Sequence, residues 1–266
     1  NYTGFNSIKT NLGTLRNQGF EMEVKANILN NVNGFSWDVS ANLSTVANKI
    51  VKLPANGNEN NRQGGYQVYD PQKGEVVWVG GKQGGGKLGD LFAFKQDHIF
   101  KDWDDVKANA NNRYDAIGEL YGPAAWEALK DKAGKQPIEP GDVCWADLNN
   151  DGVINNLDRV KVGNLFPTVT GGFSTTLGYK DFSLYARFDY ALGHTLYNDL
   201  AARSLGQYQG SFNIIDMVKD SWSETNQNTD IPKFYYADKL SKKNITRSNN
   251  GLTAVDNNSS RFYEKG

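Results

Sequence analysis

Two pairs of segments in this chain alternate hydrophobic and polar residues with a period of two. The first pair lies within about residues 13–45, on either side of the turn-like sequence Asn-Asn-Val-Asn-Gly. The second pair lies within about residues 170–192 and turns at Lys180 and Asp181. Because successive side chains of a strand point to opposite faces, each pair predicts a β-hairpin with one apolar and one polar face.

Long polar stretches lie outside the hairpins, at about residues 45–87, 101–169 and 193–257, and the first of them is rich in asparagine, glycine and glutamine. Shorter segments in or between these stretches have patterns of their own. We expect a strand at residues 90–100 and an amphipathic helix at residues 212–222. We also expect one or two short helices at residues 103–134, broken at Gly122 and Pro123.

Short turns that alternate with very long connections are typical of an outer-membrane β-barrel, which has short periplasmic turns and long extracellular loops. In a compact soluble domain, structureless loops beyond about 15 residues are uncommon. Large aromatic residues near the ends of the apolar faces indicate a membrane interface: Phe35, Trp37, Tyr179, Phe182, Phe188 and Tyr190. We therefore predict an all-β fold: antiparallel strands forming part of a large transmembrane outer-membrane β-barrel, with extracellular loops that contain short helices.

Composition and charge narrow the classes of partner. Only 38% of the residues are hydrophobic, and glycine (28) outnumbers proline (7), a balance that suits strands joined by polar loops. The net charge of −1 offers no basic footprint for nucleic acid. No apolar run approaches the roughly 20 residues of a membrane-spanning helix. The chain starts without methionine and stops just after a strand-like sequence, as we expect of a piece of a longer protein.

Residues 147–158, Asp-Leu-Asn-Asn-Asp-Gly-Val-Ile-Asn-Asn-Leu-Asp, have the spacing of a calcium-binding loop, with Gly152 at the sharp turn. The oxygen ligands would come from five side chains and one carbonyl: Asp147, Asn149, Asp151, Asn155 and Asp158, and the carbonyl of Val153. We expect a structural Ca²⁺ here, which pins a long loop that has little core of its own. The alternative is an Asn/Asp-rich turn held by hydrogen bonds from side chains to the backbone.

No arrangement of residues in the sequence indicates an enzyme. His98 and His194 are isolated, without a serine motif or an acidic partner motif. Asp104 and Asp105 are adjacent on an expected helix, so their side chains should point apart. Cys144 is the single cysteine, and its place beside a bulky tryptophan favours packing over nucleophilic chemistry. We therefore predict a protein that is not an enzyme.

Several blocks of the sequence resemble, in the expected order, the carboxy-terminal part of SusC/RagA-type TonB-linked outer-membrane transporters. The strongest block lies within residues 140–173 and contains Pro-Gly-Asp, Asp-Leu-Asn-Asn-Asp-Gly-Val-Ile-Asn and Gly-Gly-Phe. The segment Asp-Ser-Trp-Ser-Glu-Thr and the closing Asn-Asn-Ser-Ser-Arg-Phe-Tyr-Glu-Lys-Gly also match. The resemblance covers nearly all of residues 1–266 and implies one part of a barrel, without the plug and the TonB-contacting segment.

The resemblance further implies a bacterial outer-membrane importer of oligosaccharides or peptides. Its partners would be a SusD-like surface lipoprotein, outer-membrane lipid, and TonB acting through the missing N-terminal part. Aromatic residues in the loops are candidates to stack on substrate, with packing inside the loops as the alternative: Tyr66, Tyr69, Trp78, Tyr208, Tyr235 and Tyr236. From the residues alone, the rival interpretation is a secreted, calcium-stabilised β-sandwich that binds glycans, in which the apolar faces cover each other.

Overall fold

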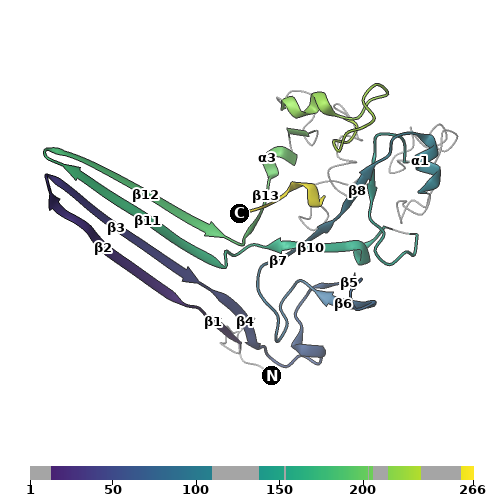
Figure 1. Ribbon diagram of the computed structural model, residues 1–266. Coiled ribbons are helices and arrows are strands. Elements are labelled where there is room, and N and C mark those ends of the chain that lie inside the picture. The colour runs from purple at the N-terminus through teal and green to yellow at the C-terminus, as the bar shows by residue number, and fades with distance from the viewer. Residues whose placement is uncertain (1–12, 110–137, 153, 203, 206–214, 235–258) are drawn as a thin grey trace, which may run out of the picture.

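A long antiparallel sheet forms one arm of the molecule, and shorter strands and helices form the other (Figure 1). The computed structural model describes residues 13–109, 138–152, 154–202, 204–205, 215–234 and 259–266. The sheet has the strand order β12-β11-β3-β2. Its strands are β2 (Glu21–Val32), β3 (Phe35–Thr45), β11 (Val169–Tyr179) and β12 (Phe182–Leu192). Both predicted hairpins are therefore present, and β3 pairs directly with β11.

The two hairpin turns lie side by side at the same end of the sheet. Asn33 and Gly34 join β2 to β3 with φ values of 52° and 85°, the left-handed region that an Asn-Gly hairpin turn adopts readily. Lys180, with φ 53°, opens the turn between β11 and β12, and its backbone N–H donates to the carbonyl of Gly34 at 2.9 Å. The long connection between β3 and β11 consequently leaves from the opposite end of the sheet (Figure 1).

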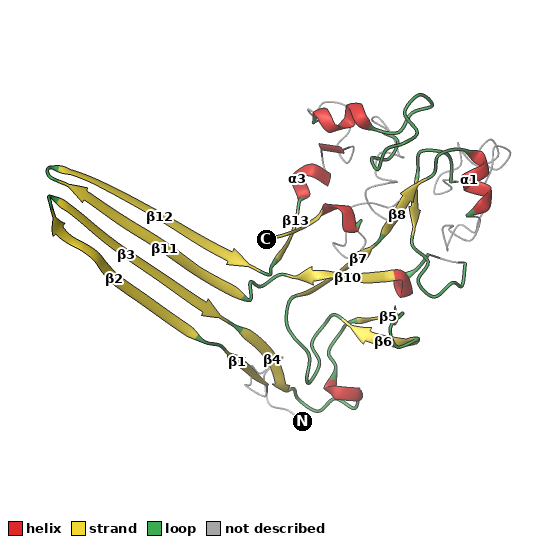
Figure 2. Ribbon diagram, in the orientation of Figure 1, coloured by secondary structure: helices red, strands yellow, loops and turns green. Residues whose placement is uncertain are grey.

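One face of this sheet is apolar and open. The register places Val24 beside Ala41 and Ala41 beside Phe173, and it continues to Phe188 on β12. Phe188 is 65% exposed and Phe182 80% exposed. At the turn end, Phe35 and Tyr179 stack with ring centroids 4.2 Å apart. Among the described residues, no second sheet covers this face (Figure 2). The sandwich interpretation is therefore not supported, because it requires two apolar faces packed together.

The opposite face carries hydroxyl, amide and charged side chains. Ser40 and Ser174, on the two central strands, are hydrogen-bonded through their hydroxyls at 2.8 Å. Asn27 donates to Asp38 across β2 and β3 at 2.8 Å. The predicted alternation of one apolar and one polar face is thus confirmed for all four strands.

The remaining strands are short and pair two by two in the described part of the chain. The pairs are β1 (Thr14–Gln18) with β4 (Ala47–Lys52), β5 (Tyr66–Asp70) with β6 (Glu75–Val79), β7 (Asp90–Phe94) with β10 (Arg159–Asn164), β8 (Gln96–Ile99) with β9 (Val143–Trp145), and β13 (Thr195–Tyr197) with β14 (Tyr263–Lys265). The helical elements are α1 (Trp103–Ala108), α3 (Asp199–Ala202), η1 (Glu59–Asn61), η3 (Asn156–Asp158), η5 (Asp216–Asp220) and η7 (Ser260–Phe262). They lie away from the long sheet (Figure 2). We call the described residues of 59–164 and 195–265 the loop region.

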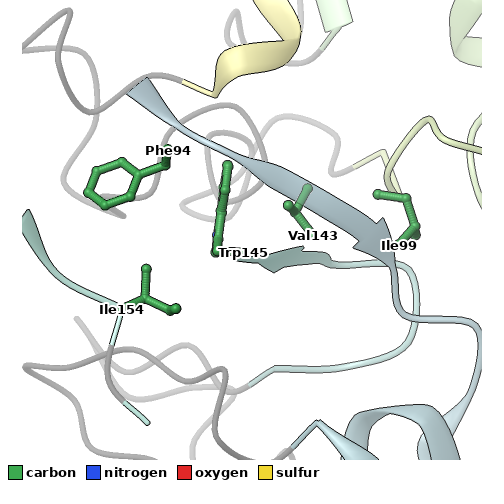
Figure 3. Close-up of a cluster of buried hydrophobic side chains, with 5 residues drawn as sticks. All are labelled: Phe94, Ile99, Val143, Trp145 and Ile154. Carbon is green, nitrogen blue, oxygen red and sulfur yellow. The ribbon is translucent and has the colours of Figure 1, made fainter. Parts of the chain in front are cut away.

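The loop region has a buried core, which corrects the expectation of a segment with little core of its own. Three clusters of buried side chains form it. The first contains Phe94, Ile99, Val143, Trp145 and Ile154 (Figure 3), the second Phe100, Val106, Ile138 and Cys144, and the third Ala202, Leu205, Ile231 and Phe262. These residues come from segments far apart in the chain, so burial of apolar surface already orders the region.

Two expected elements differ in the structure. The expected strand at residues 90–100 is interrupted at Lys95, and its halves β7 and β8 pair with different partners. The expected α-helix at residues 212–222 is wrong in its described part, which contains the short 3-10 helix η5. Its apolar residues serve two clusters: Val218 packs on the third and Trp222 on the first.

Of the expected helices at residues 103–134, α1 is present and residues 110–137 lie outside the described residues. No helix in the described segments is both long and apolar enough to span a bilayer.

Candidate functional site

The loop of residues 147–158 is anchored by packing just before it begins and again within it. Trp145, 2% exposed, closes β9 just before the loop, and Ile154, fully buried, lies within it. In Figure 3, the Trp145 indole lies between Phe94 and Val143, and Ile154 of the same cluster lies below Phe94 in this view. The Phe94 ring meets the Trp145 indole edge-on, with the two ring centroids 6.3 Å apart. The hydrophobic residues of the motif therefore anchor the loop, which leaves its polar residues to shape the backbone between them.

The first half of the loop turns around its acidic and amide side chains. Asp147 Oδ2 accepts the backbone N–H of Gly152 at 2.9 Å, across the bend where Gly152 has φ 80°. Asn149 Oδ1 accepts the backbone N–H of Asp151 at 3.2 Å, and the Asn149 amide donates to the Asp151 carboxylate at 2.8 Å. These contacts form the Asx-type turn that we considered as the alternative to a metal loop.

Asp158 closes the loop from inside the protein. It is fully buried, and its two oxygens accept the backbone N–H groups of Leu148 at 2.8 Å and Asn155 at 2.7 Å. Asn155 in turn caps η3 by accepting the N–H of Leu157 at 2.8 Å. Burial raises the pKa of Asp158 from 3.8 to about 6; the two amide bonds oppose this shift, and the nearby charges of Asp147 and Asp151 add to it.

The arrangement meets a calcium site only in part. Asp147 Oδ1 is buried without a hydrogen-bond partner, as an oxygen held for a cation would be. The carboxylates of Asp147, Asp151 and Asp158 do not converge within 4.8 Å of one another in the described loop. Val153, whose carbonyl was a predicted ligand, lies outside the described residues. Calcium binding by this loop stays a prediction.

Three of the six candidate substrate-contacting aromatics lie in β5 and β6. Tyr66 is half-buried, with the guanidinium of buried Arg159 at 4.5 Å from its ring centre. The Arg62 guanidinium lies 3.3 Å from the ring centre of Trp78, and Tyr69 is half-buried. Tyr208, Tyr235 and Tyr236 lie outside the described residues. A cation of the protein thus lies over one face of the Tyr66 ring and over one face of the Trp78 ring. Contact with substrate stays a prediction for all six.

A side-chain cluster on β8 and β9 was not foreseen from the sequence. His98 Nδ1 lies 2.9 Å from Asp97 Oδ2, and His98 Nε2 lies 3.3 Å from Asp105 Oδ1. Cys144 is the cross-strand neighbour of His98 and packs into the second buried cluster, as expected for its side chain. Asp104 and Asp105 point apart as predicted, and Asp104 remains exposed. A histidine that the sequence analysis described as isolated therefore has two acidic partners, the adjacent Asp97 and Asp105 of α1.

Comparisons with known proteins agree with this description. No family model matches the chain. It is 27% identical over 232 residues to TonB-dependent receptor P3 of Formosa agariphila, covering 87% of this chain and 20% of that protein. TonB-dependent receptor P26 of the same organism is 28% identical over 233 residues, again covering 87% of this chain and 20% of that protein. The chain thus spans about a fifth of the length of the curated relatives that it matches.

Solved structures of a transporter are similar to this chain in fold. A structure of the RagAB peptide transporter matches 99% of this chain and 23% of its own, with a TM-score of 0.55 and 18% identity. A structure of the RagAB peptide importer in the "closed-closed" state matches 99% of this chain and 23% of its own, with a TM-score of 0.52 and 19% identity. The chain is therefore a mostly β protein that shares its fold with part of a transporter.

Within that class, the resemblance to SusC/RagA-type TonB-linked transporters that the sequence predicted is confirmed, by the named TonB-dependent receptors in sequence and by RagAB in fold. These relatives are named as receptors and as a transporter, which fits the prediction of a protein that is not an enzyme.

Proposed function

We propose that this chain is part of an outer-membrane, TonB-dependent importer of oligosaccharides or peptides that works with a SusD-like surface lipoprotein. The long sheet would be a section of the barrel wall in the bacterial outer membrane. The loop region would lie on the extracellular side, where it contacts substrate or the lipoprotein. TonB would act through a part of the transporter outside this chain.

The exposed apolar face of the four-stranded sheet carries this proposal. Its side chains, among them Phe173, Leu184 and Phe188, have no protein layer over them among the described residues. A bilayer would cover them without a second sheet. Trp37 supports the same assignment, because its indole N–H donates to Thr175 Oγ1 at 2.9 Å and so has a partner on a face without water.

Barrel closure would require strands beyond the four described. The outer edges of β2 and β12 have no strand partner along their length within the described residues, and backbone groups left unpaired in lipid cost several kcal/mol each. The matched 87% of this chain covers only 20% of each relative, so a complete protein of that kind has room for those strands.

The polar face fits a wet lumen through which a hydrogen-bonding substrate passes. Lys25, Asp38, Ser40, Ser174 and Thr176 line one open groove on this face. Hydroxyl, amide and charged groups of both signs suit sugars and peptide backbones alike. The RagAB structures are named for peptides, and this favours a peptide substrate.

The role that we propose for Ca²⁺ is to hold the outer loop. Asp147, Asn149, Asp151 and Asn155 would supply oxygens together with the Val153 carbonyl, and Asp158 would complete the set or pin the backbone. The buried, unpartnered Asp147 Oδ1 supports this role. When bound, the ion would add positive charge between carboxylates that repel one another.

Uptake by cells tests the proposal. Cells that lack the whole protein should lose uptake of a labelled peptide or oligosaccharide pool, and the full-length gene should restore it only in cells with functional TonB. Pull-down of the tagged, detergent-solubilised protein should recover a surface lipoprotein. Uptake that does not depend on TonB, or a tagged protein in the soluble fraction, would refute the assignment.

A further inference from the structure

We propose that Asp97, His98 and Cys144 form a binding site for a borderline transition-metal cation, with Zn²⁺ as the reference ion. The site is separate from the loop of residues 147–158 and does not rest on the proposed transport function. One ligand atom from each side chain lies within 4.8 Å of the other two. Among the described residues, no other group of three His, Cys, Asp or Glu side chains meets that distance.

The backbone brings these three residues together in a specific way. His98 and Cys144 face each other across β8 and β9, so their side chains share one side of the strand pair. Asp97 precedes His98 and would point to the other side in a regular strand. The register shifts between Gln96 and His98, and the Asp97 carboxylate instead reaches His98 Nδ1 at 2.9 Å. Such irregularities re-aim side chains at functional sites.

The spacing is close to that of a zinc site. Zinc bonds of about 2.0–2.2 Å to nitrogen and oxygen and about 2.3 Å to sulfur, at tetrahedral angles, put ligand atoms roughly 3.3–3.6 Å apart. The Asp97 and His98 atoms are already at 2.9 Å, and the widest separation, at most 4.8 Å, must shorten by about 1 Å. Asp97 is half-exposed and free to make that adjustment by side-chain rotation.

A second carboxylate orients the imidazole. Asp105 Oδ1 lies 3.3 Å from His98 Nε2, and Asp105 Oδ2 accepts the backbone N–H of Lys101 at 2.8 Å. The Asn109 amide donates to Asp105 at 2.9 Å, so the carboxylate is held in place. A histidine that binds zinc through one nitrogen commonly donates its other N–H to a carboxylate in this manner. Asp105 thus occupies Nε2 and directs Nδ1 towards the metal.

Access and charge also suit a divalent cation. Asp97 and His98 line an open pocket of about 570 Å³ beside residues 227–231, and this pocket gives a path from solvent. Cys144, 3% exposed, closes the site from the protein side with Phe100 and Val106 of its cluster. Binding would release to solvent the thiol proton of Cys144 and the proton that His98 Nδ1 shares with Asp97, leaving a thiolate, a neutral imidazole and a carboxylate opposite two positive charges. A sulfur and an imidazole nitrogen select against Ca²⁺ and Mg²⁺.

Metal binding to the complete, detergent-purified protein tests this site. The protein is stripped with chelator and dialysed against Zn²⁺ or Co²⁺, and the bound metal is counted by mass spectrometry. Cobalt bound to a thiolate adds a charge-transfer absorption band, which reports Cys144 directly. Asp97→Asn, His98→Gln and Cys144→Ala are compared with Asp104→Asn, a matched change of charge on the neighbouring helix at an exposed carboxylate.

We expect one equivalent of zinc that is lost, or weakened at least tenfold, in the three site variants and retained in Asp104→Asn. The cobalt band should disappear in Cys144→Ala. Asp97→Asn alters a half-exposed side chain, so it separates loss of binding from failure to fold. Absence of bound zinc in the native protein, or equal binding in native protein and Asp97→Asn, would overturn the proposal.

Discussion

Replacing one residue on each face of the same strand separates a lipid-facing wall from a soluble sheet. Ala41 of β3 lies on the apolar face between Val24 and Phe173, and Asn42 lies on the polar face between Glu23 and Gly172. The two positions differ by one residue along the strand, so they sit at nearly the same depth. Arginine at either position adds the same charge and length, so any difference in the free energy of folding between the two variants comes from the surroundings.

The expected difference follows from the depth of the site. An eleven-residue strand rises about 36 Å and, when tilted, covers the roughly 25 Å apolar band of a barrel. Position 41 is close to the middle of β3, where arginine facing lipid costs about 2–4 kcal/mol. Each 1.4 kcal/mol is tenfold, so Ala41→Arg should lower the folding equilibrium roughly 30- to 1000-fold. Asn42→Arg faces Glu23, and its cost should stay within about 1 kcal/mol.

The assay is denaturant titration of the whole protein refolded into lipid vesicles. The folded fraction is read from the faster electrophoretic migration of the unboiled barrel. The native protein, Ala41→Arg and Asn42→Arg are compared at the same lipid ratio. Equal stability of the two variants would refute the claim that lipid covers the apolar face, and a larger loss for Asn42→Arg would mean that the faces are assigned the wrong way round.

Four further results are expected. Ile154→Ala should cost the loop region about 2–5 kcal/mol in denaturant unfolding because it empties a fully buried position, whereas Leu200→Ala, 75% exposed, should cost less than about 0.5 kcal/mol. The pKa of Asp158 is about 6 in the folded protein against 3.8 in the free group, so the folded state binds this proton more tightly than the unfolded state does. The contribution of Asp158 to the free energy of unfolding is therefore complete below about pH 4 and is lost as the pH rises through 6. In chelator, the unfolding midpoint should therefore fall over that interval more in the native protein than in Asp158→Asn, and identical pH profiles would contradict the assignment. At pH 7, calcium at a hundred times its dissociation constant should stabilise the native loop region by about 2.7 kcal/mol and leave Asp147→Ala unchanged; no shift in the native protein would exclude the calcium role. Gly34→Ala places a side chain at φ 85° and should destabilise the first hairpin by about 1 kcal/mol, seen as a lower yield of folded protein.

The long sheet was predictable because its information is local. Alternation fixes which side chains share a face, and the Asn-Gly and Lys-Asp turns fix where each hairpin reverses. The pairing of β3 with β11 was not local, since a long connection separates Thr45 from Val169. This pairing is consistent with both hairpin turns lying at the same end of the sheet. The hydrogen bond from the Lys180 N–H to the Gly34 carbonyl shows that the two turns are neighbours.

The loop region was less predictable because its elements are short and its contacts distant. Periodicity at residues 212–222 suggested one helical stripe, but Val218 and Trp222 belong to different clusters. Strand β9 has three residues, too few to show a period. The acidic partner of His98 came from a helix whose capping residue Asp102 holds Asp105 in place, a relation that sequence spacing did not reveal.

The candidate loop shows the same division. Its turn glycine and its run of oxygen-bearing side chains were readable from spacing alone, and the Asx-type hydrogen bonds follow from them. The burial of Asp158 was not readable, because it depends on η3 and on neighbouring β5 in the folded loop region. A position expected to be a metal ligand therefore also holds the backbone together through Leu148 and Asn155.

Strand β9 connects the two proposed metal sites, because it contributes Cys144 to one of them and leads into the loop that forms the other. All three of its residues are buried, and they alternate: Val143 and Trp145 enter the first cluster, whereas Cys144 enters the second and faces His98. Trp145 then leads directly into the loop that begins at Asp147. An ion held at His98 and an ion held in the loop would thus act on opposite faces of one short strand, and their effects on stability should be non-additive. Measuring zinc affinity with and without saturating calcium tests this coupling: equal affinities would mean that β9 transmits nothing between the sites.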